Sequence, residues 1–175
     1  LAGPEKSVAA TKSFITSLSS AALLTACWKN DNDLIRSIHH LPDDLQKATQ
    51  LNWTPAIEKL IKAKRIMVVG RGYGLSLSLE ASLKFKETCS IQAEAFSAAE
   101  IKHGPMALIE DGYPIFIFAT RGPALVSLLE LAQDLKKKGA TVILAAPAFV
   151  KEKDVEIQNC HSEELDIITA IQSFY

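Results

Sequence analysis

The sequence predicts an α/β fold of three layers, in which a parallel sheet lies between helices and is preceded by a helical segment. Three short apolar runs predict buried strands: RIMVVG, YPIFIFAT and TVILAAP. Helical patterns separate these runs, and apolar strands that alternate with helices are typical of parallel sheets covered on both faces. The chain has 175 residues, 48% of them hydrophobic and 22% charged, so it can bury a core of ordinary size.

The segment before the first strand has a helical pattern throughout. A long helix is predicted over residues 3–29, with Pro4 in its first turn and an apolar stripe at helical spacing. Residues 33–49 predict two short helices that are separated at Pro42. A further helix is predicted at TPAIEKLIKA, with Thr54 as its N-cap.

The remaining elements follow in the alternating order that a parallel sheet requires. The first strand runs into a glycine-rich turn, GRGYG. The second and third strands are connected by an amphipathic helix that ends in lysines and a glycine, PALVSLLELAQDLKKKG. After the third strand, VEIQNC predicts another strand and EELDIITAIQSFY another helix.

The stretch LSLSLEASLKFKETC, residues 75–89, alternates apolar and polar residues as a strand does. It is nevertheless predicted to be a helix, because strands usually have about 5–6 residues and its leucines, alanine, glutamates and lysines favour helices. A helix places three charged residues on one face: Glu80, Lys84 and Glu87. A neighbouring leucine stripe is expected to pack on the sheet: Leu75, Leu79 and Leu83. Spacing alone leaves a simpler alternative open, an exposed ion pair worth about 0.3–0.5 kcal/mol.

Two loops could contribute to a site. Gly70, Gly72 and Gly74 lie between a strand and a helix, where backbone N–H groups can hold a phosphate or a carboxylate. A tight turn without a ligand explains these glycines equally well, and the spacing GxGxG falls short of the dinucleotide motif GxGxxG. His103 precedes Gly-Pro in a turn, where an imidazole can act as an acid or a base near neutral pH, although a lone histidine is more often structural.

Charge and cysteine content limit the partners and the compartment. The formal net charge is −1 with dispersed basic residues, so neither nucleic acid nor a membrane surface is expected as a partner. The three cysteines lack metal-binding spacing, which favours reduced thiols in a cytoplasmic protein without a metal or cofactor. The chain begins without Met and ends within a predicted helix, so we expect a part of a longer protein.

The chain resembles the SIS (sugar isomerase) domain family in two stretches. The longer one is EASLKFKETCSIQAEAFSAAEIKHGPMALI, which resembles the second SIS domain of glucosamine-6-phosphate synthases and of two-domain SIS deaminases. The shorter one is GPEKSVAATKSF, which resembles the helix that closes the first SIS domain in these proteins. The resemblance implies a Rossmann-like SIS domain at residues 42–175, truncated at its C-terminus, and the end of a preceding SIS domain at residues 1–41.

The resemblance also implies a reaction and the residues that carry it. The family moves a proton between C1 and C2 of an open-chain sugar phosphate. Glu87 matches the base of the family, and Lys84 matches a lysine that could stabilise charge on the enediol oxygen. His103 matches the histidine associated with ring opening, which in this family reaches the site of the neighbouring subunit. A homodimer is therefore implied.

Other site residues implied by the resemblance are expected to bind substrate. Glu5 and Val8 match positions beside the sugar, and Glu80 matches a glutamate with a supporting role. The phosphate-binding loop of the first SIS domain and a C-terminal segment with a further lysine have no counterpart in these 175 residues. We therefore expect the 175 residues alone not to turn over sugar.

The implied function is the C-terminal SIS half of an isomerase or deaminase that interconverts glucosamine 6-phosphate and fructose 6-phosphate. The motif stretch favours the deaminase. Three alternatives stay open: the isomerase part of a glutamine–fructose-6-phosphate transaminase, a deglycase that cleaves sugar–amine adducts, and a non-catalytic phosphosugar-binding module. The last has no need for a Glu-Lys-Glu row together with a His-Gly-Pro turn.

Overall fold

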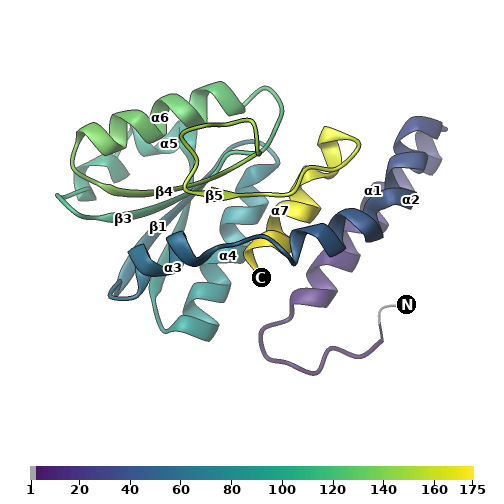
Figure 1. Cartoon of the computed structure of the whole chain (residues 1–175), viewed down its shortest axis with the longest axis horizontal. Helices are drawn as coiled ribbons and strands as arrows, with labels where there is room; N and C mark the ends of the chain where they lie inside the picture. Colours follow the sequence, from purple (N-terminus) through teal and green to yellow (C-terminus); the bar gives the residue numbers. More distant parts are fainter. Residues whose placement is uncertain (1–2) are drawn as a thin grey trace.

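A five-stranded parallel sheet forms the centre of the computed structural model, which describes residues 3–175 (Figure 1). The strands lie in the order β2-β1-β3-β4-β5, and each adjacent pair is parallel. Their bounds are β1 Arg65–Gly70, β2 Gln92–Ser97, β3 Pro114–Phe118, β4 Thr141–Ala146 and β5 Val155–Glu156. The predicted α/β class and the three strands expected from apolar runs are confirmed.

Helices cover both faces of the sheet and bury one apolar cluster against each (Figure 1). The first face carries α3 Thr54–Leu60, α4 Gly74–Cys89 and α7 Asp166–Phe174, with α1 Thr11–Lys29 and α2 Asn32–Ala48 packed beside them. The second face carries α5 Ala98–Ile101 and α6 Leu125–Lys137. Two 3₁₀ turns complete the chain: Pro105–Leu108 and Glu163–Leu165.

Strand β2 is an element that the apolar-run criterion missed. Its sequence, QAEAFS, contains three polar residues and no run of branched aliphatic side chains. The strand lies at the edge of the sheet and pairs with β1 alone, so several of its side chains face solvent. The continuous apolar run that indicates a strand buried on both faces is therefore not expected for β2.

The region before the sheet differs from the prediction in three places. Residues 3–10 are not helical, because α1 begins only at Thr11. Residues 32–48 form one helix through Pro42 rather than two short helices. A proline inside a helix costs about 3 kcal/mol, and burial of the neighbouring face of α2 against the core offsets this cost. Trp53, not Thr54, is the N-cap of α3.

An ion pair fixes the start of α7 to the loop after β3. Arg121 donates two hydrogen bonds to the carboxylate of the fully buried Asp166, at 2.6 and 2.7 Å. Asp166 also accepts from the Cys160 N–H at 2.8 Å, and Arg121 donates to the Cys160 carbonyl at 2.6 Å. The bidentate geometry and full burial make this a rigid attachment.

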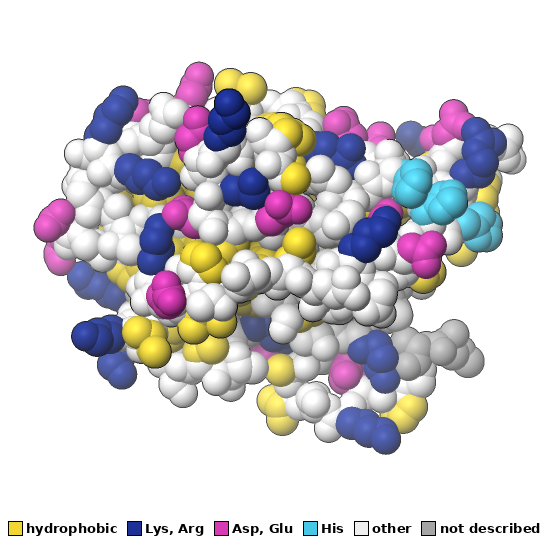
Figure 2. All heavy atoms as spheres, in the orientation of Figure 1, with side chains coloured by type: hydrophobic (Ala, Val, Ile, Leu, Met, Phe, Trp, Pro, Cys, Tyr) yellow, Lys and Arg dark blue, Asp and Glu magenta, His cyan; other side chains and the backbone are white. Residues whose placement is uncertain are grey.

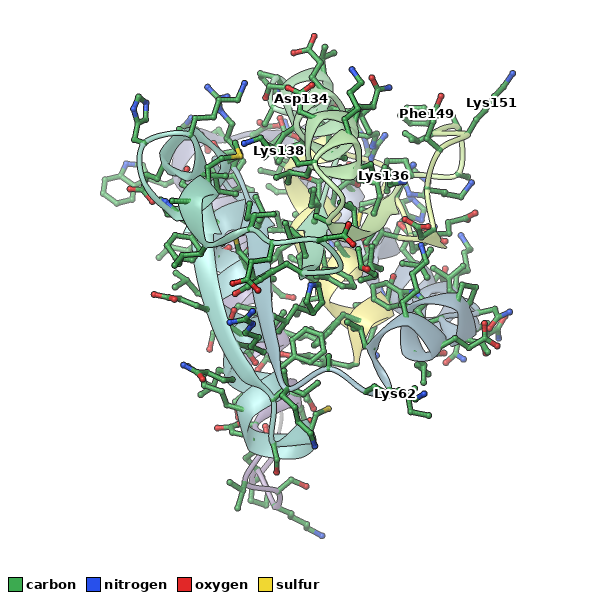
Figure 3. The ribbon with its side chains drawn as sticks, turned by 90° about the vertical axis from the view of Figure 1, so that its left-hand side faces the viewer. Lys62, Asp134, Lys136, Lys138, Phe149 and Lys151 are labelled. Carbon is green, nitrogen blue, oxygen red and sulfur yellow. The ribbon has the colours of Figure 1, made fainter. Side chains whose placement is uncertain are left out.

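Charged side chains are interspersed over the face shown in Figure 2. The lysine run at the end of α6 is exposed, and Figure 3 shows Lys136 and Lys138 beside Asp134 on the outer surface. Lys136 Nζ lies 3.7 Å from an Asp154 carboxylate oxygen. Within residues 3–175, no helix is both long and apolar enough to cross a membrane.

The joint between β1 and α4 yields a first prediction. A Cβ at Gly70 would overlap the backbone carbonyl of Gly74, whereas a Cβ at Gly74 would meet its nearest atom at 3.8 Å. We expect Gly70→Ala to lower the free energy of unfolding by at least about 2 kcal/mol, and Gly74→Ala to change it by less than about 1 kcal/mol. Urea unfolding measures both, and equal effects of the two variants would contradict the packing argument.

Candidate active site

A row of three charged side chains lies along α4, as the helical prediction requires. Lys84 Nζ lies 2.7 Å from Glu87 Oε2 and 3.4 Å from Glu80 Oε1. The side chains of Lys84 and Glu80 are only 6% and 9% exposed, and that of Glu87 is 24% exposed. The simpler alternative of an exposed surface ion pair is therefore wrong.

The orientation of α4 explains why these charges are buried. Leu77, Ala81 and Phe85 form the face that packs on the sheet and are almost fully buried. Leu79 and Leu83 are 59% and 42% exposed, so the expectation that they pack on the sheet is wrong. The face of α4 that packs on the sheet follows the spacing of Leu77, Ala81 and Phe85. Leu79 and Leu83 lie on a different face of the helix and are exposed.

The ammonium of Lys84 remains charged in this environment. Burial lowers the pKa of Lys84, but the hydrogen bond to Glu87 and the negative charge of Glu80 outweigh it, so the pKa lies above its usual value. A lysine with a raised pKa is a hydrogen-bond donor and a positive charge near neutral pH. It is not a free amine nucleophile.

The row borders a cleft of about 940 Å³ between α3 and the last turns of α4 and α7. Lys84 is the member of the row that lines this cleft, and most of the remaining wall is apolar or aromatic. The aromatic part of the wall comes from five residues: Trp53, Phe85, Phe116, Phe174 and Tyr175. Lys64 also lines the cleft, together with several hydroxyl and amide side chains. An apolar wall with charged and polar groups placed in it is typical of small-molecule sites.

Tyr175 joins the row from α7 and was not singled out in the sequence. Its hydroxyl donates a hydrogen bond to Glu80 Oε1 at 2.6 Å. Burial and this hydrogen bond raise the pKa of Tyr175 well above its usual range, so the phenol keeps its proton. The residues are 95 positions apart in the chain, and a C-terminal aromatic residue carries no sequence signal for such a contact.

Glu5 lies near the same row from the N-terminal segment. It accepts hydrogen bonds from the N–H and the hydroxyl of Ser13, both at 2.8 Å, which lower the pKa of Glu5. Lys84 contributes a weaker attraction in the same direction. Val8 is 90% exposed and has no buried contact here. Glu5 and Val8 lie on the segment that leads into α1. Ala9 and Thr11, which follow them in the sequence, line the cleft.

His103 lies on the opposite edge of the sheet from Glu87. Because β1 and β2 are parallel, α4 between them returns from the carboxyl edge to the amino edge, where it ends at Cys89. His103 follows α5, after the carboxyl end of β2. From Gly74 to Glu87, a rise of about 1.5 Å per residue gives about 20 Å, and Figure 1 shows α5 and the last turns of α4 at opposite ends. One chain does not bring His103 and Glu87 together.

The glycine turn has a steric explanation. Gly70 is required by its close approach to Gly74, and Gly72 has φ of +58°. His40, in α2, stacks on His161 at 4.3 Å between ring centroids. Among residues 3–175, no group of three or more His, Cys, Asp or Glu side chains is placed to hold a metal ion.

Comparison with solved structures defines the class of protein. A protein from Silicibacter pomeroyi, described as a phosphosugar isomerase, is 37% identical and superposes with a TM-score of 0.90, over 99% of this chain and 53% of that one. This chain is thus an α/β domain with the same fold as about half of that protein. A sequence model of the SIS domain matches residues 59–174, and the chain belongs to the SIS domain family.

Aminotransferases are among the other relatives. The C-terminal domain of glucosamine-fructose-6-phosphate aminotransferase from Francisella tularensis is 28% identical with a TM-score of 0.83, over 98% of this chain and 53% of that one. The isomerizing glutamine–fructose-6-phosphate aminotransferase from Pyrobaculum aerophilum is 36% identical over 94% of this chain. This chain spans 29% of that enzyme, and about half of the two solved chains.

Removing the ammonium from the row should destabilise the fold in a pH-dependent way. In Lys84→Met, the carboxylates of Glu80 and Glu87 face each other without a positive charge, so we expect a loss of about 2–4 kcal/mol at pH 7. The loss should shrink near pH 4, where protonation removes the repulsion. Urea unfolding at both pH values measures it, with the exposed Lys86→Met as the control. A loss that is the same at both pH values would contradict the ion-pair explanation.

Proposed function

We propose that this chain is the C-terminal SIS half of an enzyme that interconverts glucosamine 6-phosphate and fructose 6-phosphate. The observation that carries the proposal is the row formed by the buried Glu80 and Lys84 and the partly exposed Glu87, with Lys84 lining a cleft. Two carboxylates and an ammonium at this spacing suit proton transfer between adjacent carbons with charge developing on oxygen. Membership of a family whose relatives include phosphosugar isomerases supports a sugar phosphate as ligand.

In the proposed mechanism, Glu87 is the base. Its carboxylate removes the proton from C2 of the open-chain aldose, and the electrons form the enediol while the carbonyl oxygen takes negative charge. The ammonium of Lys84 stabilises that oxygen, which becomes the C1 hydroxyl by taking the proton from the C2 amino or hydroxyl group as Glu87 delivers its proton to C1. With the amino sugar this leaves an imine at C2, which water hydrolyses to the ketone with release of ammonia. Glu87 has the more exposed carboxylate of the row, which suits a group that must reach substrate. Glu80 supports Lys84 from the other side.

We propose that Glu5 and Val8 lie beside the sugar. The charge of Lys84 weakly lowers the pKa of Glu5. This attraction, and the lining of the cleft by Ala9 and Thr11, support a role for the N-terminal segment in the site. Residues 1–41 are proposed to be the end of a preceding SIS domain and residues 42–175 the SIS domain itself, in keeping with a family match that begins at residue 59.

The site is proposed to form in a homodimer. Glu87 and His103 lie at opposite edges of one sheet, so a site that uses both must take His103 from a neighbouring copy. The exposed Leu79 and Leu83 lie on the same face of α4 as Glu87, at i−8 and i−4, and would be covered in such an assembly.

A second candidate is the isomerase part of a glutamine–fructose-6-phosphate aminotransferase, which the identity to the Pyrobaculum aerophilum enzyme favours. The two candidates share the proton transfer and differ in the source or fate of ammonia. Incubating the full-length protein with glucosamine 6-phosphate tests for ammonia release. Incubating it with fructose 6-phosphate tests whether glucosamine 6-phosphate forms only when glutamine is present.

Replacement of the proposed base should abolish proton exchange. In the full-length protein, Glu87→Gln should slow exchange of the C2 proton of fructose or glucosamine 6-phosphate with deuterated water by at least about 100-fold, because an amide cannot accept the proton. Nuclear magnetic resonance of the sugar measures the exchange. The exposed Glu152→Gln should leave the rate unchanged. Undiminished exchange in Glu87→Gln would remove Glu87 from this role.

The shared site makes a further prediction about mixed dimers. Full-length Glu87→Gln and His103→Asn should each be inactive as homodimers. A mixed dimer then has one site with both native residues, so random mixing should restore about a quarter of the wild-type activity. Unfolding and refolding the two variants together, followed by the exchange assay, measures this. No recovery in dimers shown to be mixed would place both residues in one subunit.

A further inference from the structure

We propose that Tyr175 is a positioning residue of this site, whose hydroxyl holds Glu80 so that Lys84 stays bonded to Glu87. The inference rests on the proposed function and adds a residue that no motif in the sequence indicated. Tyr175 touches neither reacting carbon in the mechanism above. It acts through Glu80 and Lys84.

The distances in the row are asymmetric. Lys84 Nζ is 2.7 Å from Glu87 but 3.4 Å from Glu80, although both carboxylates are within reach of the same ammonium. The Glu80 oxygen nearest to Lys84 is Oε1, which is also the oxygen that accepts from Tyr175 at 2.6 Å. A short hydrogen bond to an ionised acceptor is strong. It therefore restrains Glu80 and reduces the pull of that oxygen on Lys84.

Tyr175 is well suited to hold a fixed position. It follows Phe174, whose ring packs among Phe85, Phe116 and Phe118 at centroid distances of 5.2 to 6.1 Å. The far end of α7 is fixed by the Arg121–Asp166 pair. The phenol also keeps its proton, since its pKa is raised by burial and by Glu80, so it donates throughout the working pH range.

Other charged groups act on the row from the packed elements. Glu80 and Lys84 lie on α4 itself, Tyr175 comes from α7, and Glu5 comes from the N-terminal segment. Of these, only Lys84 makes a direct ion pair with Glu87 among the described residues. A change that moves Lys84 toward Glu80 should therefore weaken the ion pair between Lys84 and Glu87.

The test is Tyr175→Phe in the full-length protein, which removes one oxygen and keeps the ring. Tyr73→Phe is the matched control, because Tyr73 is 74% exposed. Full-length protein labelled with carbon-13 at glutamate carboxyls is titrated, and signals are assigned with Glu80→Gln and Glu87→Gln. We expect Tyr175→Phe to move the titration midpoint of the Glu87 signal upward by about half a pH unit, because the carboxylate loses part of its contact with Lys84.

The same variants are then assayed for exchange of the C2 proton. Tyr175→Phe should lower kcat by about fivefold to tenfold, the effect of one hydrogen bond, with little change in KM and with the acid limb of the pH profile moved upward. In a Glu80→Gln background, Tyr175→Phe should change neither the Glu87 midpoint nor kcat any further, because the carboxylate through which Tyr175 acts is already gone.

The outcomes separate the two proposals. A Glu87 midpoint that stays in place in Tyr175→Phe, or the same loss of kcat with and without Glu80, overturns the positioning role. A shifted midpoint in a protein whose wild-type form exchanges no C2 proton keeps the positioning role and overturns the proposed function instead.

Discussion

The structure depends on one constraint: the side chain of Lys84 is only 6% exposed, so its ammonium must be paired, and it is paired with two carboxylates of its own helix. This pairing lets α4 pack its apolar face on the sheet while it carries two buried charges, Glu80 and Lys84, and the partly exposed Glu87. The close contact between Gly70 and Gly74 sets the start of α4 against β1. Tyr175 completes the arrangement from α7. The charged row is thus held by elements from both halves of the chain.

A second constraint comes from the parallel sheet. Each connecting helix must return from the carboxyl edge to the amino edge, so residues at the end of α4 and residues that follow β2 are kept apart by the length of the helix. Chemistry that needs both Glu87 and His103 cannot be intramolecular in this topology. Assembly is therefore a geometric requirement of the proposed reaction and not merely a stabilising feature.

Sequence reasoning recovered the parts of the fold with strong periodic signals. The strands around Val68, Phe116 and Ile143 are apolar after their first residue, and α4 was predicted from its length and composition. Edge strand β2 was missed because half of it faces solvent. The buried face of α4 was misassigned because alternating leucines and serines define two possible stripes, and only packing selects Leu77 over Leu79. The Glu-Lys-Glu row followed from spacing, but its burial did not. The contact between Tyr175 and Glu80 could not be predicted, because it joins residues 95 positions apart.

The place of Tyr175 at the end of α7 has a consequence for biosynthesis. The charged face of α4 leaves the ribosome well before the phenol that binds Glu80 is made. Until then, Glu80 has Lys84 as its neighbour and water as its other partner. The nascent domain therefore passes through a stage in which its sheet is nearly complete but its polar row is unfinished. Ribosome-bound chains that stop shortly before α7 would also lack Phe174, whose ring packs against Phe85, Phe116 and Phe118.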